Sequence, residues 1–390
     1  MSASGTTRIA MVAGEASGDM LASHLITALK QHLPDAQFCG IGGPKMQAAG
    51  CDTWWPAEKL AVRGYAEVLR HYRAIAAIRR SLLKRLLTEK PDVFIGIDAP
   101  DFNLWLEKKL KARGIPTIHF VSPSIWAWRG QRIRKIGRSV SHMLCLFPFE
   151  SELYEKQKIP ASYIGHPIAD VIPLEPNQLA VRELLNLPAE GLIFALLPGS
   201  RQSELHFMAD TFIETAKLLH QRFPQAHFLV PLVTRETRYQ FESAQWRLGA
   251  QELPLTILFG HAQEAMAAAD ASLVASGTAT LEAALVKKPM VITYKMSPWS
   301  WWLMRRMKYQ PWVGLPNILA NCFAVPEFLQ DEATPDNLAQ ALGNLVCDQT
   351  MRERLCDLFT DIHRNLRQNT AEKAAAAILP YLEKGEAAAA

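Results

Sequence analysis

Short apolar runs rich in β-branched residues alternate with stretches of helical periodicity along most of the chain. This alternation is typical of parallel sheets whose strands are joined by crossover helices. In the first half the runs predict strands at 9–13, 37–39, 93–97, 117–121, 143–147 and 163–164. In the second half they predict strands at 193–197, 227–231, 256–259, 272–275 and 290–293. We therefore expect an α/β fold with two doubly wound domains.

The two series of strands meet in a proline-rich stretch, residues 165–188, whose prolines favour a stiff hinge. We place the first domain at residues 1–170 and the second at 171–349. Beyond about residue 335 the pattern is helical only. A chain of 390 residues agrees with two domains at roughly 150 residues each.

Composition narrows the class of protein. The chain is 49% apolar and 21% charged, which excludes a disordered or collagen-like protein. Its 6 cysteines form no C-x-x-C pair, so neither a zinc knuckle nor a disulfide framework is indicated. No apolar run reaches the roughly 18 residues of a spanning helix. The N-terminus lacks the order of a signal peptide, and we expect a cytoplasmic protein.

The charge is unevenly distributed. Residues 1–170 contain 23 Lys or Arg and 15 Asp or Glu, a balance of +8, whereas the remaining residues contain 19 and 23, a balance of −4. Such a basic excess suits nucleic acid, anionic lipid or a phosphorylated substrate, and composition does not choose among them.

Loops that follow the strands are where ligands bind in open parallel sheets. After strand 9–13 comes a small-residue turn, residues 14–19, in which Gly14 allows close approach and Glu15 and Ser17 can bond a sugar. The alternative is a helix cap formed by Ser17 or Asp19. Neither G-x-G-x-x-G nor G-x-x-x-x-G-K-[ST] occurs, which argues against nicotinamide or ATP binding.

Two carboxylates follow strand 93–97. Asp98 stands at the end of the strand, where it can accept a proton from an attacking hydroxyl. Asp101 follows Pro100 at the start of a helix and is expected to complement the helix dipole. The alternative assigns the cap to Asp98 instead.

The second half offers an anion site. Strand 193–197 runs into Pro198-Gly199-Ser200-Arg201, where a turn at a helix start offers N–H groups and Arg201 adds a guanidinium. After strand 272–275, the loop Ser276, Gly277, Thr278, Ala279 and Thr280 can cradle a diphosphate, and Glu282 can accept ribose hydroxyls. An ordinary S/T-rich helix start is the alternative. No metal-ligand pattern is visible, and we expect no metal or other cofactor.

Two segments suggest a membrane surface. Residues 67–87 form an amphipathic pattern with a strongly basic polar face, which favours an interfacial helix over a core-packed one. Residues 296–312 combine tryptophans with basic residues, as at a lipid headgroup boundary. Core packing is the alternative for both segments. The residues predicted to face the membrane are Val68, Leu69, Tyr72, Ile75, Arg79, Arg80, Trp299 and Trp302.

A third basic stretch, residues 126–138, interleaves aromatics with arginines, which can stack on bases. No recognisable nucleic-acid module accompanies it, and we expect no nucleic-acid partner.

Together these loops resemble those of the lipid-A-disaccharide synthase family, glycosyltransferases with the two-domain GT-B fold. The resemblance extends over nearly the whole chain. It rests on residues 12–19, 96–103, 121–124, 197–201, 276–282 and 315–317, in that order.

The resemblance implies an inverting, metal-independent enzyme that joins UDP-2,3-diacylglucosamine to 2,3-diacylglucosamine 1-phosphate, giving a β-1,6-linked disaccharide phosphate and UDP. It implies two Rossmann-like domains facing a cleft, with the helices of residues 350–385 packed on the first. It also implies peripheral attachment to the cytoplasmic face of the bacterial inner membrane, and it leaves a homodimer open.

Residue roles follow from the same resemblance. Asp98 is expected to be the general base on the acceptor 6-hydroxyl, with Glu15 near it, and Gly14, Ser17 and Ser122 belong to the acceptor loops. The UDP side is expected to comprise Ser200, Arg201, residues 276–280, Glu282 and Asn317.

Other functions remain open at this level. One is a different GT-B enzyme, such as a UDP-N-acetylglucosamine transferase or epimerase. Another is a peripheral membrane protein that binds a nucleotide without turnover.

Overall fold

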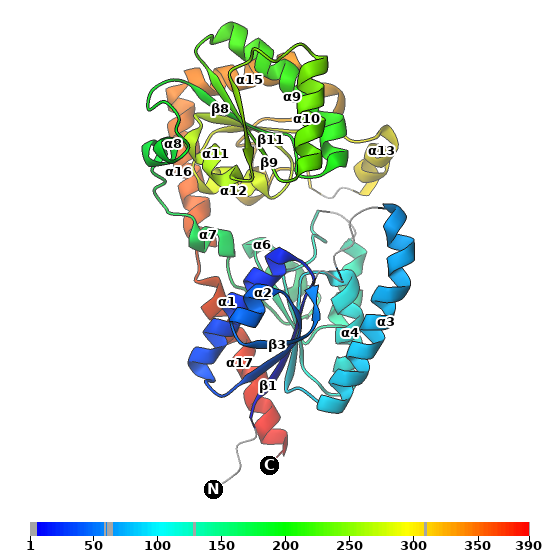
Figure 1. The fold of residues 1–390 in the computed structure, drawn as a ribbon. Helices are drawn as coiled ribbons and strands as arrows, with labels where there is room; N and C mark the ends of the chain where they lie inside the picture. Colours follow the sequence, from blue (N-terminus) through cyan, green and yellow to red (C-terminus); the bar gives the residue numbers. More distant parts are fainter. Residues whose placement is uncertain (1–5, 58–59, 61–64, 128–129, 308–309, 390) are drawn as a thin grey trace. The chain divides into compact units, whose positions relative to one another are not determined.

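The computed structural model describes residues 6–57, 60, 65–127, 130–307 and 310–389, which form two compact units (Figure 1). Unit 1 comprises Met1–Asp170 and Leu366–Ala390, and unit 2 comprises Val171–Asn365. Each contains one parallel sheet covered by helices on both faces, which confirms the predicted α/β class.

Unit 1 contains a seven-stranded sheet in the order β3-β2-β1-β4-β5-β6-β7. The strands are β1 Arg8–Ala13, β2 Gln37–Gly42, β3 Cys51–Pro56, β4 Val93–Ile97, β5 Thr117–Phe120, β6 His142–Cys145 and β7 Ala161–Tyr163. The helices are α1 Ala16–His32, α2 Pro44–Ala48, α3 Tyr65–Glu89, α4 Pro100–Lys111, α5 Ile133–Gly137, α6 Pro148–Glu155, α7 Pro167–Val171 and α17 Thr370–Ala389, with a 3-10 turn at Gly130–Arg132. The sequence did not predict β3, a six-residue strand at the edge of the sheet.

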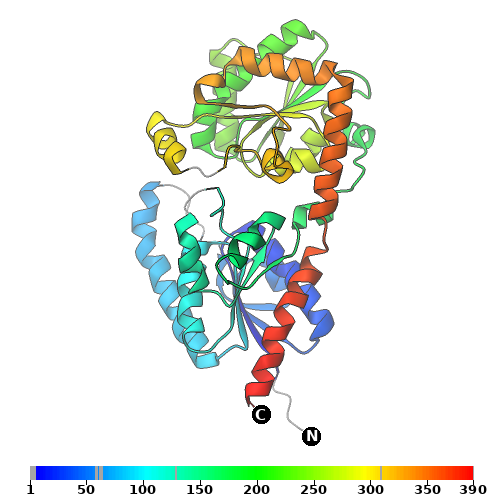
Figure 2. The ribbon, with the colours of Figure 1, turned by 180° about the vertical axis from the view of Figure 1, so that it is seen from behind.

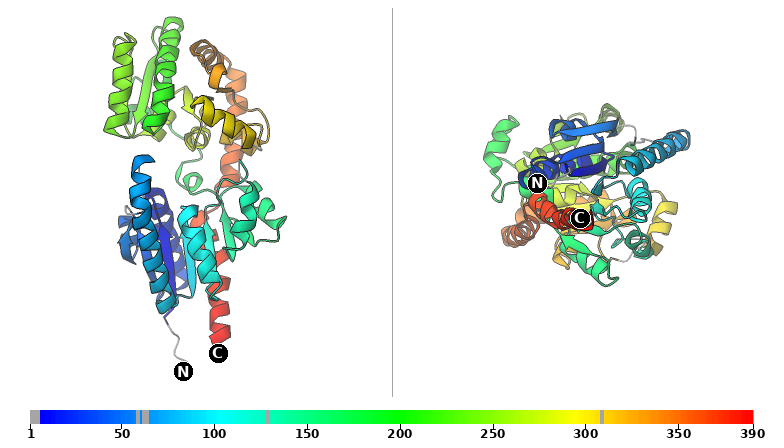
Figure 3. Two further views of the ribbon diagram at one scale, coloured as in Figure 1. Left: turned by 90° about the vertical axis from the view of Figure 1, so that its right-hand side faces the viewer. Right: turned by 90° about the horizontal axis from the view of Figure 1, so that it is seen from below.

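Apolar side chains hold α3 and α4 against one face of the unit 1 sheet. Leu82 and Leu86 of α3 and Leu106 of α4 pack with Val12 and Phe94 of the central strands. Figure 1 shows α1, α2 and α17 on the opposite side of the sheet, and the left view of Figure 3 shows α3 beside α4. The alternation of sides is the doubly wound arrangement.

The last helix belongs to unit 1, as Figure 2 shows from behind. Asp170 caps its N-terminus: Oδ1 accepts from the N–H groups of Gln368 and Asn369 at 3.0 Å each, and Oδ2 accepts from that of Thr370 at 2.7 Å. The helix then lies against α1. Asp170, where the chain leaves unit 1, is thus hydrogen-bonded to the segment with which the chain re-enters unit 1.

The division differs from the sequence expectation for residues 350–365. They were expected to pack on the first domain, whereas they belong to unit 2 as most of α16, Gln349–Leu366. His363 of α16 is fully buried and hydrogen-bonded to Lys287. Because this contact and the buried Phe359 fix α16 to unit 2, only the chain from Leu366 onward returns to unit 1.

Unit 2 contains a six-stranded sheet in the order β10-β9-β8-β11-β12-β13. The strands are β8 Ile193–Leu197, β9 His227–Leu232, β10 Leu255–Phe259, β11 Ala271–Ala275, β12 Met290–Tyr294 and β13 Glu327–Leu329. The other helices are α8 Gln178–Leu184, α9 Gln202–Arg222, α10 Arg235–Arg247, α11 Ala262–Ala268, α12 Ala279–Leu285, α13 Pro298–Met307, α14 Leu315–Ala320 and α15 Pro335–Cys347, with a 3-10 turn at Gln330–Glu332. The three-residue β13 was not predicted.

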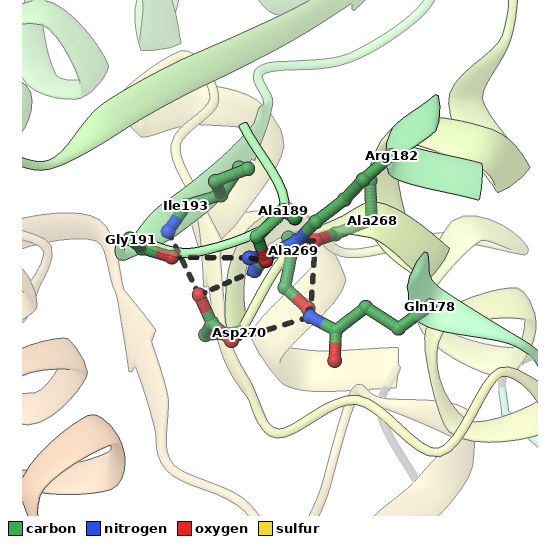
Figure 4. A network of polar contacts seen from close by, with 8 residues as sticks. All are labelled: Gln178, Arg182, Ala189, Gly191, Ile193, Ala268, Ala269 and Asp270. Carbon is green, nitrogen blue, oxygen red and sulfur yellow. Dashed lines mark hydrogen bonds and ion pairs between the residues drawn. The ribbon is translucent and has the colours of Figure 1, made fainter. Parts of the chain in front are cut away.

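A buried guanidinium fixes the amino ends of the two central strands of unit 2 (Figure 4). Arg182 of α8 donates to Oδ2 of Asp270 at 2.9 Å and to the carbonyls of Ala268, Ala189 and Gly191 at 2.9, 2.9 and 3.2 Å. The same Oδ2 accepts from the N–H of Ile193 at 2.8 Å. Asp270 precedes β11 and Ile193 begins β8, so the network ties both strands to α8 at the edge opposite the loops discussed below.

We expect Arg182→Met to lower the free energy of unfolding of unit 2 by about 1–3 kcal/mol, because the half-buried Asp270 carboxylate and three backbone carbonyls lose their donor. Urea denaturation followed by tryptophan fluorescence measures the loss. Arg238→Met is the matched control, since Arg238 pairs with Glu242 on an exposed helix face, where a pair contributes roughly 0.3–0.5 kcal/mol. Equal losses in the two variants would contradict the role given to Arg182.

Candidate active site

The strand order of each sheet reverses at one place. In unit 1 this place is between β1 and β4, and in unit 2 it is between β8 and β11. The pairs Ala13↔Ile97 and Leu197↔Val274 show that neighbouring strands end at nearly the same level. Ligands of doubly wound sheets bind at such a reversal, beyond the carboxyl ends of the strands. Each unit therefore has one candidate site, and the predicted loops lie there.

Asp98 occupies an unusual backbone conformation at the unit 1 reversal. It and Ala99 have φ angles of 50° and 42°, in the left-handed region that side chains other than glycine rarely adopt. The N–H of Asp98 donates to the carbonyl of Phe120 in β5 at 2.9 Å. Ala99 is the N-cap residue of α4 and no side chain caps this helix. The half-buried Asp98 carboxylate is therefore not a helix cap.

The loop after β1 lies beside Asp98. A Cβ built on Gly14 would lie 3.2 Å from Cβ of Ala99, so the absence of a side chain there accommodates the left-handed turn. Glu15 and Ser17 are exposed at the start of α1, and Glu15 is an N-cap residue whose side chain makes no capping bond. The Glu15 and Asp98 carboxylates thus follow adjacent strands.

Asp19 has a structural role that the sequence did not indicate. Its Oδ1 accepts from the N–H groups of Gly43 and Met46 at 2.8 and 3.0 Å, and its Oδ2 accepts from that of Lys45 at 3.0 Å. Asp19 therefore caps α2 and not its own helix.

Ser122, predicted to lie in an acceptor loop, is buried and bonded within the protein. Its Oγ lies 2.8 Å from the hydroxyl of Tyr154. The following Trp126 donates from Nε1 to Glu150 at 3.0 Å, and Glu150 also accepts from the N–H groups of Leu146 and Phe147. Burial raises the pKa of Glu150 to about 7. These contacts attach the loop after β5 to α6.

In unit 2 the turn before α9 differs from the expected amide cradle. The N–H groups of Ser200 and Arg201 donate to Oε2 of Glu204 at 2.8 and 3.2 Å. Gly199 has a φ of 125°, and a Cβ there would lie 2.6 Å from Cβ of Glu204. Glu204 thus occupies the two amides expected to bind an anion. The Arg201 side chain is 80% exposed, and although its Nη1 lies 3.8 Å from Oε1 of Glu204, its other N–H groups can bind an anion.

The loop after β11 divides into an exposed and a buried part. Gly277 and Thr278 are exposed, whereas Ser276 is half-buried and donates to the carbonyl of Val313 at 3.3 Å. Thr280 is fully buried and donates to the carbonyl of Gly277 at 2.7 Å, so it shapes the loop and does not face a ligand. Ala279 begins α12 and is half-buried.

Asn317, predicted to bind UDP, is fully buried and makes four internal hydrogen bonds. Its Nδ2 donates to the carbonyl of Val325 and to Oε1 of Glu327 at 2.9 and 2.8 Å, and its Oδ1 accepts from the N–H groups of Ala324 and Val325 at 2.8 Å. Glu327 in turn accepts from the N–H of Gly314 at 2.9 Å. Asn317 therefore holds the segment around α14 in place, which corrects the sequence assignment.

Some side chains of α3 that were predicted to face a membrane pack within unit 1 instead. The side chains of Val68, Leu69 and Tyr72 lie outside the described residues. Ile75 packs against the core, contrary to expectation. Arg79 stacks on Trp105 of α4 at 4.5 Å and is half-buried, whereas Arg80 is exposed.

Helix α13 presents the exposed aromatic surface that the sequence predicted. Trp299 and Trp302 stack with ring centroids 5.2 Å apart, and the guanidinium of Arg306 lies 3.9 Å from the ring of Trp302. The exposed fractions of Trp299 and Trp302 are 72% and 41%. Among the residues that the structure describes, no helix is long and apolar enough to span a membrane, and no group of three or more His, Cys, Asp or Glu side chains could hold a metal.

Burial and the nearby Glu264 carboxylate raise the pKa of Glu282 in α12. A carboxyl group with a raised pKa in the folded state costs no stability below its unfolded value of about 4.3, and it costs stability increasingly as the pH rises. We expect Glu282→Gln to raise Tm at pH 8, with a difference that vanishes toward pH 4. Thermal melts across this range test it, with the exposed Glu190→Gln as the control. A lower Tm for Glu282→Gln at pH 8 would contradict the assignment.

Comparison with known proteins relates the chain to one family. A model of the family described as lipid-A-disaccharide synthetase matches residues 9–378. The chain is 64% identical over 376 residues to a lipid-A-disaccharide synthase of Dechloromonas aromatica, covering 96% of this chain and 98% of that one. It is 62% identical to one of Aromatoleum aromaticum, with 97% of each chain covered.

Solved structures of low sequence identity share the fold. The UDP-N-acetylglucosamine 2-epimerase of Neisseria meningitidis, bound to UDP-N-acetylglucosamine, superposes with a TM-score of 0.64 at 13% identity, covering 96% of this chain and 100% of that one. The kitacinnamycin glycosyltransferase superposes with a TM-score of 0.62 at 17% identity, covering 96% and 99%. The fold is thus that of GT-B proteins, and over nearly its whole length the chain belongs to the lipid-A-disaccharide synthetase family.

Proposed function

We propose that the chain transfers diacylglucosamine from UDP-2,3-diacylglucosamine to the 6-hydroxyl of 2,3-diacylglucosamine 1-phosphate, forming the β-1,6-linked disaccharide phosphate and UDP. Membership of the family over residues 9–378 supports the overall reaction. The observation that supports a mechanism is the placement of Asp98 at the strand-order reversal of unit 1, with a carboxylate that caps no helix.

In the proposed reaction, the Asp98 carboxylate accepts the proton of the acceptor 6-hydroxyl as its oxygen attacks C1 of the donor sugar. The bond between C1 and the diphosphate oxygen breaks with inversion, and UDP leaves with the electron pair. A positioned base of this kind contributes typically 10²–10⁴-fold to the rate. Glu15, on the adjacent loop, is proposed to position the acceptor sugar.

The negative charge that develops on the leaving diphosphate requires compensation in unit 2. Arg201 is the exposed cation at the end of β8, and the exposed Gly277–Thr278 turn follows the neighbouring β11. We propose that these groups contact the diphosphate and that Glu282 accepts from the ribose hydroxyls. A guanidinium matches two phosphate oxygens at once, which makes it effective where charge develops. On this proposal no metal is required.

Turnover of the two lipid substrates in detergent micelles with EDTA tests this assignment. We expect Asp98→Asn to lower kcat at least about 100-fold and Arg201→Ala to lower it about 10²–10³-fold, with wild-type activity unaffected by EDTA. Asp101→Asn is the matched carboxylate control, because the Asp101 side chain is 88% exposed and pairs with Arg132. It should keep nearly full activity. A folded wild-type protein without product would contradict the proposed reaction, and full activity in Asp98→Asn would contradict the assigned base.

We further propose that the protein attaches peripherally to the cytoplasmic face of the inner membrane, where both lipid substrates would be reached. The stacked Trp299 and Trp302 beside Arg305 and Arg306 form a surface suited to lipid headgroups, since tryptophan favours the interface and arginine attracts anionic lipid. The exposed Arg80 of α3 adds positive charge.

Binding to vesicles that contain phosphatidylglycerol tests the membrane proposal. We expect the double variant Trp299→Ala/Trp302→Ala to weaken binding about tenfold or more, because two amphipathic rings leave the interface. Trp246→Ala is the control, since Trp246 of α10 is 76% exposed and lies outside this surface. Equal binding by the double variant and the control would exclude α13 as the contact.

A further inference from the structure

The backbone of Asp98 is held by a side chain that the proposed reaction does not use. Asn103, in the first turn of α4, is fully buried. Its Nδ2 donates to the carbonyl of Asp98 at 2.8 Å and lies 3.4 and 3.5 Å from the carbonyls of Ile97 and Val12. These carbonyls belong to the end of β4, the left-handed turn after it and the neighbouring β1. One amide thus joins the three backbone segments from which the reaction loops begin.

The orientation of the Asn103 amide is determined by its surroundings. Three carbonyl oxygens surround its nitrogen, so a rotated amide would direct its own oxygen at other acceptors. Its Oδ1 is buried without a partner among the described residues. Leaving a buried acceptor unpaired costs about 1–3 kcal/mol. Because the unpaired Oδ1 offsets part of the stability that the Nδ2 hydrogen bonds contribute, a contribution to global stability does not fully explain why an asparagine occupies this position.

A buried hydrogen-bonded pair supports α4 one turn further on. Oε1 of Glu107 lies 2.6 Å from Nδ1 of His119 in β5, and both side chains are fully buried. A Cβ on Gly96 of β4 would lie 2.2 Å from Oε1 of Glu107 and 2.9 Å from Cβ of Asn103. The bare backbone of Gly96 thus lets this polar face of α4 lie directly on β4, which sets the depth at which Asn103 reaches the strand ends.

From these contacts we infer that Asn103 is a positioning residue for the reaction: it holds the left-handed turn that presents Asp98, and the Glu107–His119 pair fixes the helix that carries it. The N–H of Asp98 is bonded to β5 and its carbonyl to Asn103, so the peptide groups on both sides of this residue are fixed. Without the amide, the turn is free to relax and the carboxylate moves. The inference rests on the proposed role of Asp98 as the base.

A double-mutant cycle separates positioning from general stability. Asn103→Ala and Asp98→Asn are made singly and together, and kcat, KM and the affinity for UDP are measured. We expect Asn103→Ala to lower kcat about 10–100-fold, with KM and UDP affinity within about twofold of wild type. In the Asp98→Asn background the same change should lower kcat less than threefold, because residues that act as a unit are not additive.

Thr117→Val is the matched control. Thr117 is fully buried at the opposite end of β5 and donates to the carbonyl of Ser139 at 2.9 Å, so the variant also removes one buried hydrogen bond from unit 1. It should lower Tm and leave kcat unchanged. Should Asn103→Ala fail to fold, Asn103→Ser, which keeps one donor of shorter reach, enters the same cycle and should lower kcat at least threefold.

The outcomes are distinct. Equal fold-losses of kcat from the Asn103 change in both backgrounds, or a loss no larger than that of Thr117→Val, would overturn the positioning role while leaving Asp98 as the base. Full activity of Asp98→Asn would instead refute the proposed base itself.

Discussion

Parallel pairing of β1 with β4 in unit 1, and of β8 with β11 in unit 2, is the constraint on which the candidate site of each unit depends. Parallel strands release their loops at one edge of a sheet, and the helices that follow the two strands of each pair lie on opposite faces. The loops therefore diverge and leave backbone and side chains accessible between them. The opposite edge of unit 2 has another use: the Arg182–Asp270 network joins strand beginnings there, where no ligand has to enter.

Several polar side chains of the described loops hold those loops in place and are not available to a ligand. Glu204 binds two amides of its own turn, Asp19 caps the neighbouring helix, and Asn317 makes four internal bonds. Glu15 and Arg201, in contrast, project into solvent. Rigid loops built by internal hydrogen bonds can present a few free side chains at fixed positions, as catalysis by preorganised charge requires.

The sequence predicted the central strands well because burial leaves an unambiguous pattern. β4 and β8 were predicted to the residue, since each is a fully buried apolar run. The edge strand β3 was missed because its exposed positions include Asp52 and its apolar residues include two half-buried tryptophans. Strand β5 was predicted one residue too long, because Val121 turns to a φ of 79° and no property of valine indicates that conformation.

Some candidate site residues could be predicted because the strands that precede them were predicted correctly. The rule that ligands bind at strand ends selected Asp98 and Arg201 from local sequence alone. It could not show that Glu204 occupies the amides beside Arg201, or that Ile75 faces the core, since both facts depend on how a helix packs after it forms. Asn103 lay within a sequence motif, but its contact with the carbonyl of Asp98 is determined by the depth at which α4 packs.

The strained backbone at the end of β4 carries the Asp98 carboxylate and depends on the residues packed around it. Left-handed residues other than glycine cost about 1–2 kcal/mol each, and Asp98 and Ala99 adopt this conformation consecutively. Such strain persists only where the surroundings impose it. Here β5 binds the N–H of Asp98, Asn103 binds its carbonyl, and Gly14 leaves room for Ala99. These contacts, which oppose the strain of the two left-handed residues, therefore keep the Asp98 carboxylate at the edge of the sheet.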